Sequence, residues 1–424
     1  MAKKKEPQVV HPPTKRQLTH WQKQTLRQRI IAITAIVTIL AVIAVIVVPG
    51  YFKWYVPNIK PMHETVVEVN GHKFSTAYYV DALKYFDQAY YNGQTEYIPY
   101  ILDAVEQNIE QIELMKQAAT ALGITVSDSD VAQLIQNNSL DDNQAVKDIV
   151  RGQLLRDKLL SDYFGPQVPT SGEQRDVLAM FLESQSQLDD IKAQINAGAD
   201  FGQLATDNSL ESTTQGDKGA LGSHFKGVFD YLLSTTGLDD AIFAQQAGIW
   251  GDFHDTDTTK QVGYWLVKVT ERNSDNSQVH VSGMLLGSLE EAQSVKTHLD
   301  SGEDFTTLAQ QYSQKWSDTS KDDLGWITTS STDAYKSYVF DTTVAVGTIS
   351  TPIKDTSQST KGGYWLFKVV GSTTGDISSD DKTDLTNKAF NDWLTALQAD
   401  TVNNTIVNSL DQAKKDFATA QAES

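Results

Sequence analysis

The sequence contains no cysteine, which excludes both disulfides and a lipid anchor attached through a cysteine. It also lacks an excess of basic residues. The formal net charge is −19, and because an acidic surface repels a polyphosphate, nucleic acid is excluded as a partner. A disordered chain is excluded as well, since 424 residues with 40% hydrophobic content are enough for two or three domains with buried cores.

One stretch of the chain lacks charge altogether. Residues 30–48 have the sequence IIAITAIVTILAVIAVIVV, in which two threonines are the only polar members. At about 1.5 Å per residue, a helix of this length just crosses a bilayer core of roughly 30 Å. The sequence therefore predicts a single transmembrane helix over residues 30–50.

The flanks of this stretch predict its orientation. Eight basic residues and one acid precede it, so the positive-inside rule places residues 1–29 in the cytoplasm and the acidic remainder outside it. An aromatic cluster suited to the far interface follows, consisting of Tyr51, Phe52, Trp54 and Tyr55. A cleaved signal peptide is the alternative, but its apolar core is usually shorter and ends in small residues. We expect an uncleaved, single-pass protein of the cell membrane.

Residues 63–165 predict a helical module that follows a short strand. The segment ETVVEVNGHKFS alternates apolar and polar residues around an Asn-Gly turn, and Ser75 stands where a helix N-cap belongs. A long amphipathic run stops at Gly123, and Ser127 with Asp130 then marks the start of another helix. Start and stop signals therefore agree over this region.

The first of these helices is rich in tyrosine. Helix packing is the favoured interpretation of this stripe. The alternative is a surface that binds unfolded peptide, because a tyrosine ring is apolar with a polar tip. The candidate substrate-binding residues are Tyr78, Tyr79, Tyr85, Tyr90 and Tyr91.

A repeat with a period near 100 residues follows. VGYWLVKV ends at Val269 and GGYWLFKV ends at Val369. Upstream, AGADFGQLATDNS matches SGEDFTTLAQQYS, and KGALGSHF matches DDLGWITT. This period is too long for a solenoid unit and right for a small domain. We expect two tandem α/β domains, at residues 166–274 and 275–374.

These motifs carry a resemblance to a known family. VNGHKFS followed by a long helix ending AATALGITVSDSDV resembles the N-terminal region of the SurA, PrsA and PpiD group of extracytoplasmic folding factors. DFxxLAxxxS, LG and GYWLxKV are similar to parvulin domains. The resemblance implies an α+β protein whose helical module is completed by a C-terminal helix, residues 375–424, in which AFNDWL matches the family pattern.

The resemblance also implies where a prolyl isomerase site would lie. Active parvulins carry one His on the first strand and one on the last, with an Asp or Cys between them. Here the first-strand positions are Ala179 and Gly283, the last-strand positions are Trp265 and Trp365, and the intervening positions are Glu211 and Lys315. None of the family's histidines is present.

These departures decide the expected chemistry. Prolyl rotation crosses a barrier of about 18–20 kcal/mol, and lowering it takes a polar network around the twisting imide. A His pair donates and accepts hydrogen bonds, whereas indole only donates. Tryptophan on a buried strand usually packs, which favours a core role for Trp265 and Trp365 over a direct role in substrate binding.

The other candidate sites are weaker. His224 and His254 align with no catalytic residue and are expected in solvated loops, and no further ligand stands at metal-binding spacing. The acidic segment DISSDDKTD lacks the order of a calcium loop and is expected to be a linker and helix start. We expect neither a metal nor a cofactor.

Two classes of function remain open. One is a membrane-tethered chaperone that binds unfolded polypeptide clients emerging from the protein translocation channel. The other is an active prolyl isomerase whose site tolerates different residues. The missing histidines favour the first class.

Overall fold

The computed structural model describes residues 15–315 and 322–424. They form two compact units, one of Met1–Lys158 with Trp393–Ser424 and the other of Leu159–Asp392. Part of the predicted cytoplasmic tail, residues 1–14, lies outside the described residues.

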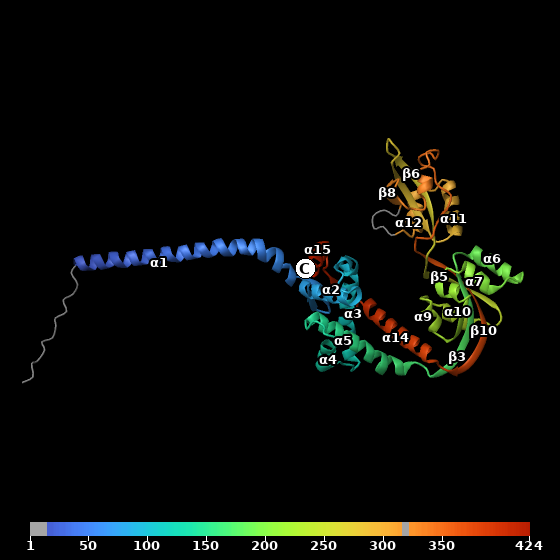
Figure 1. Ribbon diagram of the computed structural model, residues 1–424, viewed down its shortest axis with the longest axis horizontal. Helices are drawn as coiled ribbons and strands as arrows, with labels where there is room; N and C mark the ends of the chain where they lie inside the picture. Colours follow the sequence, from blue (N-terminus) through green and yellow to red (C-terminus); the bar gives the residue numbers. More distant parts are fainter. Residues whose placement is uncertain (1–14, 316–321) are drawn as a thin grey trace, which may run out of the picture. The chain divides into compact units, whose positions relative to one another are not determined.

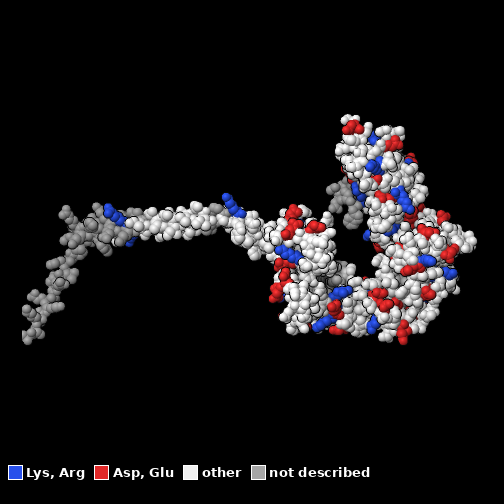
Figure 2. All heavy atoms as spheres, viewed as in Figure 1, with Lys and Arg blue, Asp and Glu red and all other residues white. Residues whose placement is uncertain are grey.

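The uncharged stretch lies within one long helix, α1 (Lys15–Gly50), which is followed by η1 (Tyr51–Ile59) and η2 (Pro61–His63). The aliphatic side chains described in α1, such as Ile31 and Val45, are exposed, and Figure 2 shows a run of this helix with neither acidic nor basic residues. Within residues 15–315 and 322–424, no single helix meets the length and hydropathy needed to cross a membrane. One pair, Ile31–Ile46 with Tyr51–His63, meets them together but bends by 43°.

The prediction of one straight spanning helix over residues 30–50 is therefore not supported. Gly50 lies at the break, and Pro57 lies inside η1. Glycine weakens a helix through its backbone freedom, which fits a bend beside Gly50. Pro57 lies within the second segment of the pair, where its missing N–H removes one helical hydrogen bond.

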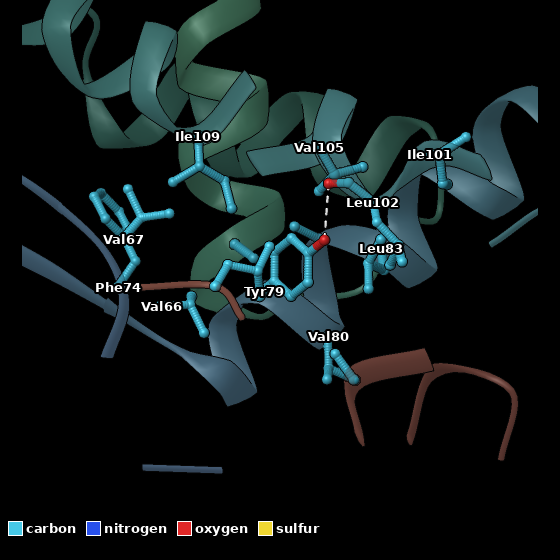
Figure 3. Packing of buried hydrophobic residues seen from close by; sticks show 14 of the residues in the cluster. Val66, Val67, Phe74, Tyr79, Val80, Leu83, Ile101, Leu102, Val105 and Ile109 are labelled. Atoms are coloured by element: carbon cyan, nitrogen blue, oxygen red, sulfur yellow. Dashed lines mark hydrogen bonds between the residues drawn. The ribbon is translucent and has the colours of Figure 1, made fainter. Parts of the chain in front are cut away.

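The first unit is mainly helical, as the sequence predicts. Besides α1, η1 and η2, it contains β1 (Thr65–Val69), β2 (His72–Ser75), α2 (Thr76–Tyr91), η3 (Thr95–Tyr97), α3 (Ile98–Ala121), α4 (Asp128–Asn137), α5 (Gln144–Lys158), β11 (Ile406–Asn408) and α15 (Gln412–Ala422). The strands form an antiparallel sheet in the order β11-β1-β2. In the core, the ring of Tyr79 lies among aliphatic side chains and its hydroxyl donates to the Leu102 carbonyl at 2.8 Å (Figure 3).

The C-terminal segment completes this unit through β11 and α15. β11 pairs with β1, and Leu410, Ala418 and Ala422 join the core. The predicted anchor AFNDWL does not make these core contacts. Its Phe390 lies on α14 (Ser379–Ala399) and packs edge-to-face on Phe164 at 6.0 Å, a contact within the second unit, to which both residues belong.

The second unit contains two four-stranded sheets with helices. Its segments are η4 (Leu159–Phe164), η5 (Gly165–Gln167), β3 (Ser171–Leu182), α6 (Gln185–Asn196), α7 (Phe201–Asn208), α8 (Ser212–Gly216), β4 (Ala220–Phe225), α9 (Val228–Leu232), α10 (Leu238–Ala244), β5 (Trp250–Lys260), β6 (Gly263–Arg272), β7 (Gln278–Leu286), α11 (Leu289–Asp300), α12 (Phe305–Tyr312), β8 (Asp323–Thr328), α13 (Lys336–Val339), β9 (Ile353–Asp355) and β10 (Thr360–Asp376). The sheet orders are β4-β3-β10-β5 and β8-β7-β6-β9, so the two sheets have equivalent arrangements.

The last strand of each repeat belongs to the sheet of the other repeat. β6, which ends the first repeat in sequence, lies between β7 and β9. β10 lies between β3 and β5, and these three strands are labelled together in Figure 1. We call residues 171–260 with 360–376 the first α/β body and residues 263–355 the second α/β body. The second body is thus inserted into the first.

This strand exchange differs from the contiguous domains 166–274 and 275–374 that the sequence predicts. At the crossing between the two bodies, β5 continues to Lys260, and only two residues separate it from β6. There the two crossing segments pair with each other, with Thr360 opposite Lys260 and Lys361 opposite Thr259.

Candidate functional site

The inward row of the first body is built by its two central strands. β3 supplies Ala179 and Phe181, and β10 supplies Trp365 and Phe367, all in one buried cluster. In the register, Ala179 stands opposite Phe367, and Phe181 stands opposite Trp365. We call this row of buried, inward-facing side chains the floor of the body. Because of the strand exchange, Ala179 lies on the same floor as Trp365 and not with the Trp265 of its own repeat.

A hydrogen bond to a buried carboxylate holds the indole of Trp365. Its Nε1 donates to Asp255 Oδ2 at 2.9 Å. Asp255 also accepts from the Thr235 hydroxyl and from the backbone N–H of Thr258 at 2.9 Å. Burial acts to raise the pKa of Asp255, but these hydrogen bonds outweigh it and lower the pKa below its ordinary value. The aspartate is therefore ionised at neutral pH.

The second body repeats this arrangement. Trp265 Nε1 donates to Asp355 Oδ2 at 3.0 Å, and the indole packs edge-to-face on Tyr335 at 5.2 Å. Burial alone would raise the pKa of Asp355, yet hydrogen bonds from Ser357 and Trp265 lower it. Gly283 lies opposite Val267 on this floor, so the structure brings Gly283 together with Trp265 and not with Trp365.

The side chains at the two intervening positions form hydrogen bonds with backbone groups nearby in the sequence. The Glu211 carboxylate is the N-cap of α8 and accepts from the N–H groups of Thr213 at 2.8 Å and Thr214 at 2.7 Å. Lys315 Nζ donates to the Asp323 carbonyl at 3.1 Å, and burial lowers the pKa of this lysine. Both side chains thus stabilise local structure.

Both tryptophans are buried, as the core interpretation predicts: Trp365 is 0% exposed and Trp265 is 4% exposed. The sequence interpretation missed their partners, Asp255 and Asp355. A signal was present, because an Asp-Thr pair stands ten residues before the tryptophan of each GYW motif. Each floor therefore holds a buried tryptophan whose indole N–H is bonded to a buried aspartate.

The candidate tyrosines of α2 have different environments. Tyr79 is fully buried, which removes it from the candidate binding surface. Tyr78 is half-buried beside Asp148, and burial raises the pKa of its hydroxyl. Tyr85 is half-buried and accepts from Gln153 Nε2 at 3.2 Å. A helix with one face in a core cannot present all its tyrosines to a ligand.

The end of α2 and the start of α3 carry an exposed aromatic group. Tyr90 stacks on Phe86 at 5.8 Å, and Tyr91 stacks on Tyr97 at 4.8 Å. Tyr90 is 69% exposed and Tyr100 is 83% exposed. We call Phe86, Tyr90, Tyr91, Tyr97 and Tyr100 the tyrosine surface. The sequence interpretation included Tyr90 and Tyr91 but missed Tyr97 and Tyr100, which belong to the next amphipathic run.

The two histidines of the first body lie on strands and not in solvated loops. His224, on β4, bonds through Nδ1 to Asp381 at 2.7 Å, because α14 brings the acidic DISSDDKTD segment against this strand. His254, on β5, stacks on Tyr364 at 4.5 Å. In the described part of the chain, no cluster of three or more His, Cys, Asp or Glu side chains could hold a metal ion.

Two family models match the chain. The family of SurA-like N-terminal domains matches residues 23–162, and the family of PPIC-type PPIase domains matches residues 287–371. The foldase protein PrsA of Caldanaerobacter subterraneus subsp. tengcongensis is 23% identical over 191 residues, which are 39% of this chain and 62% of that protein. The chain thus spans less than two thirds of the curated relative that it matches.

Solved structures of PrsA are also similar. The peptidylprolyl isomerase PrsA of Bacillus cereus is 10% identical, with 85% of this chain and 99% of that chain covered and a TM-score of 0.26. The foldase PrsA of Streptococcus pneumoniae is 11% identical, with 83% and 98% covered and a TM-score of 0.28. The two family matches place a SurA-like N-terminal domain and a PPIC-type domain in one chain, which is the composition of a SurA/PrsA-type foldase.

Proposed function

We propose that this chain, a SurA/PrsA-type foldase by domain composition, is a membrane-anchored extracytoplasmic chaperone that binds unfolded secreted or envelope proteins. We further propose that its α/β bodies lack isomerase activity. One observation carries the second proposal: on both floors, a buried tryptophan is hydrogen-bonded to an ionised aspartate.

The chemistry of the floors supports the absence of isomerase activity. Lowering a prolyl barrier of about 18–20 kcal/mol takes donors and acceptors that face the twisting imide. The indole N–H of Trp365 is already donated to Asp255, and Ala179 offers no side-chain polar atom. The second body has the same deficit, with Trp265 bound to Asp355 and Gly283 on the opposite strand.

Helix α1 supports the membrane anchor. Its uncharged stretch exposes large aliphatic side chains, among them Ile31 at 68% and Val45 at 73%. Exposed apolar area costs about 25 cal/mol per Å², so a hydrocarbon environment is favoured for this helix. The basic residues before it favour a cytoplasmic N-terminus, which leaves the chain after α1 on the outer side, where the translocation channel is a candidate partner.

The tyrosine surface is the candidate place for client contact. Tyr90, Tyr97 and Tyr100 are exposed, and the first two of these stack on the half-buried rings of Phe86 and Tyr91. Tyrosine combines apolar area with a hydroxyl that tolerates water. Such a surface suits unfolded segments of varied sequence.

Active prolyl isomerisation is the second candidate, and the match of residues 287–371 to the PPIC-type PPIase family favours it. A protease-coupled prolyl assay on residues 60–424, run beside an aggregation assay with an unfolded client, separates the two. We expect background isomerisation rates and suppressed aggregation. Uncatalysed prolyl bonds relax in tens of seconds, so a modest acceleration is easy to detect and would establish the enzyme instead.

A further inference from the structure

The two closing strands differ at one position of the motif they share. β6 contains GYWLVKV and β10 contains GYWLFKV, so the difference is Val267 against Phe367. Both strands keep the same register, with Trp365 opposite Phe181 and Trp265 opposite Leu285. A direct topology, in which each repeat is closed by its own strand, would re-form these shared contacts.

The first body has room for a phenylalanine at this position. Phe367 is 1% exposed and stands opposite Gly251 of β5. A Cβ added to Gly251 would lie 2.7 Å from Phe367 Cζ, closer than real Cβ contacts allow. The glycine therefore supplies the space that the ring occupies, and a valine here would leave a void.

The second body lacks that space. Ser350 stands beside Val267: its N–H donates to the Val267 carbonyl at 2.9 Å, and its Oγ accepts from the Val267 N–H at 3.0 Å. On the other side, a Cβ on Gly283 would lie 2.9 Å from Val267 Cγ1 and 2.6 Å from Leu324 Cδ1. This floor has Ser350 where the first body has Gly251, and Gly283 where the first body has Ala179. Val267 and Leu324 already fill the space that Gly283 leaves, so little room remains for a larger side chain at position 267.

We propose that this size match selects the exchanged topology. Phe367 fits the first body and Val267 fits the second, so returning each strand to its own repeat incurs overpacking in one body and a cavity in the other. The rest of the closing-strand motif is shared and favours neither topology. The sizes of the residues at positions 267, 367 and 251 thus determine which closing strand completes which sheet.

Engineered disulfides test the proposal, because the native chain has no cysteine. His254 and Tyr364 are directly opposite on neighbouring strands, so His254→Cys with Tyr364→Cys reports the exchanged topology. The matched control, His254→Cys with Tyr264→Cys, forms a disulfide only in the direct topology. After refolding and mild oxidation of the full chain, we expect an intrachain disulfide in the first variant and none in the second.

The size match itself is tested by adding Val267→Phe and Phe367→Val to both cysteine variants. We expect the ratio of 254–364 to 254–264 disulfide to fall by at least about tenfold, the effect of a modest change in packing energy. An unchanged ratio would overturn the proposal, as would disulfide-linked dimers, which would place the exchange between chains.

A second measurement covers the case in which the double exchange fails to fold. Gly251→Ala should lower the melting temperature through contact with Phe367, and Phe367→Val in the same chain should restore part of the loss. Additive effects of the two substitutions would contradict the direct size match.

Discussion

Trp365 Nε1 donates to Asp255 Oδ2 at 2.9 Å, although the two residues are separated by 110 positions in the chain. The equivalent pair, Trp265 and Asp355, is separated by 90 positions. Within a single repeat, the aspartate would stand only ten residues before the tryptophan. The same local bond therefore links the two repeats to each other at two places.

Removing the indole donor should destabilise the first body. In Trp365→Phe, the buried Asp255 keeps its bonds from Thr235 and Thr258 but loses the indole donor, and a hydrogen bond to a charged group contributes about 1.5–3 kcal/mol. Urea unfolding should show this loss. Trp326→Phe is the matched control, because Trp326 is 45% exposed and should cost little. Equal losses in both variants would show that the bond to Asp255 contributes nothing specific.

The two α/β bodies should unfold together, because β10, which completes the first sheet, is connected to β5 only through the second body. Met284 is fully buried in the second body, and Met284→Ala should cost about 2–5 kcal/mol. We expect hydrogen exchange to accelerate by the same factor in β3 of the first body and in β8 of the second. Faster exchange confined to β8 would mean that the bodies unfold independently.

Deleting residues 405–424 should expose the core of the helical unit. This deletion removes β11 from its place beside β1 and takes Leu410, Ala418 and Ala422 out of the core. The truncated chain should aggregate, which light scattering will detect. The control ends at Ala422, since the last two residues, Glu423 and Ser424, are exposed. A truncated chain that stays as soluble as the control would show that this segment is dispensable.

The helical unit should lose stability as pH rises toward about 8. On α3, burial and then the hydrogen bond and charge of Glu106 raise the pKa of Glu110 from 4.5 to about 8, and Asn408 donates to Glu106 at 2.5 Å. A raised pKa means that the folded state binds more protons than the unfolded state, so stability falls between about pH 4.5 and pH 8.

Glu110→Gln should flatten this dependence in urea unfolding of the whole chain at several pH values. Glu96→Gln, at an exposed position on η3, is the control and should leave the slope unchanged. A slope that is the same in all three proteins would contradict the assignment to Glu110.

Features governed by local sequence were predictable. Ser75 and Ser127 cap α2 and α4 as expected, because a capping serine accepts from an N–H only three residues away. The repeat and its element order also followed from motifs within each copy. The burial of Trp265 and Trp365 followed from their place on apolar strands.

The strand exchange was not predictable from these patterns. The closing strands share their motif except at Val267 and Phe367, so periodicity cannot say which sheet receives which strand. The distinction lies in a contact between Phe367 and Gly251, residues distant in the chain. Ala179 and Gly283 were consequently paired with the wrong tryptophans, although these four positions were found on their expected strands.

The order in which strands occur along the chain also constrains the order of folding during synthesis. The second body, residues 263–355, is continuous and has all its strands once residue 355 has emerged. The first body began earlier, at β3, but waits for β10, and the helical unit waits for β11 near residue 406. The three parts are thus nested in the sequence, with the second body inside the first body and the first body inside the helical unit. The second body can therefore fold first. In an emerging chain, β3 has β4 on one side but no partner on its other side until β10 appears, and β1 has β2 but waits for β11. The earliest strands of this protein therefore depend longest on protection by other factors.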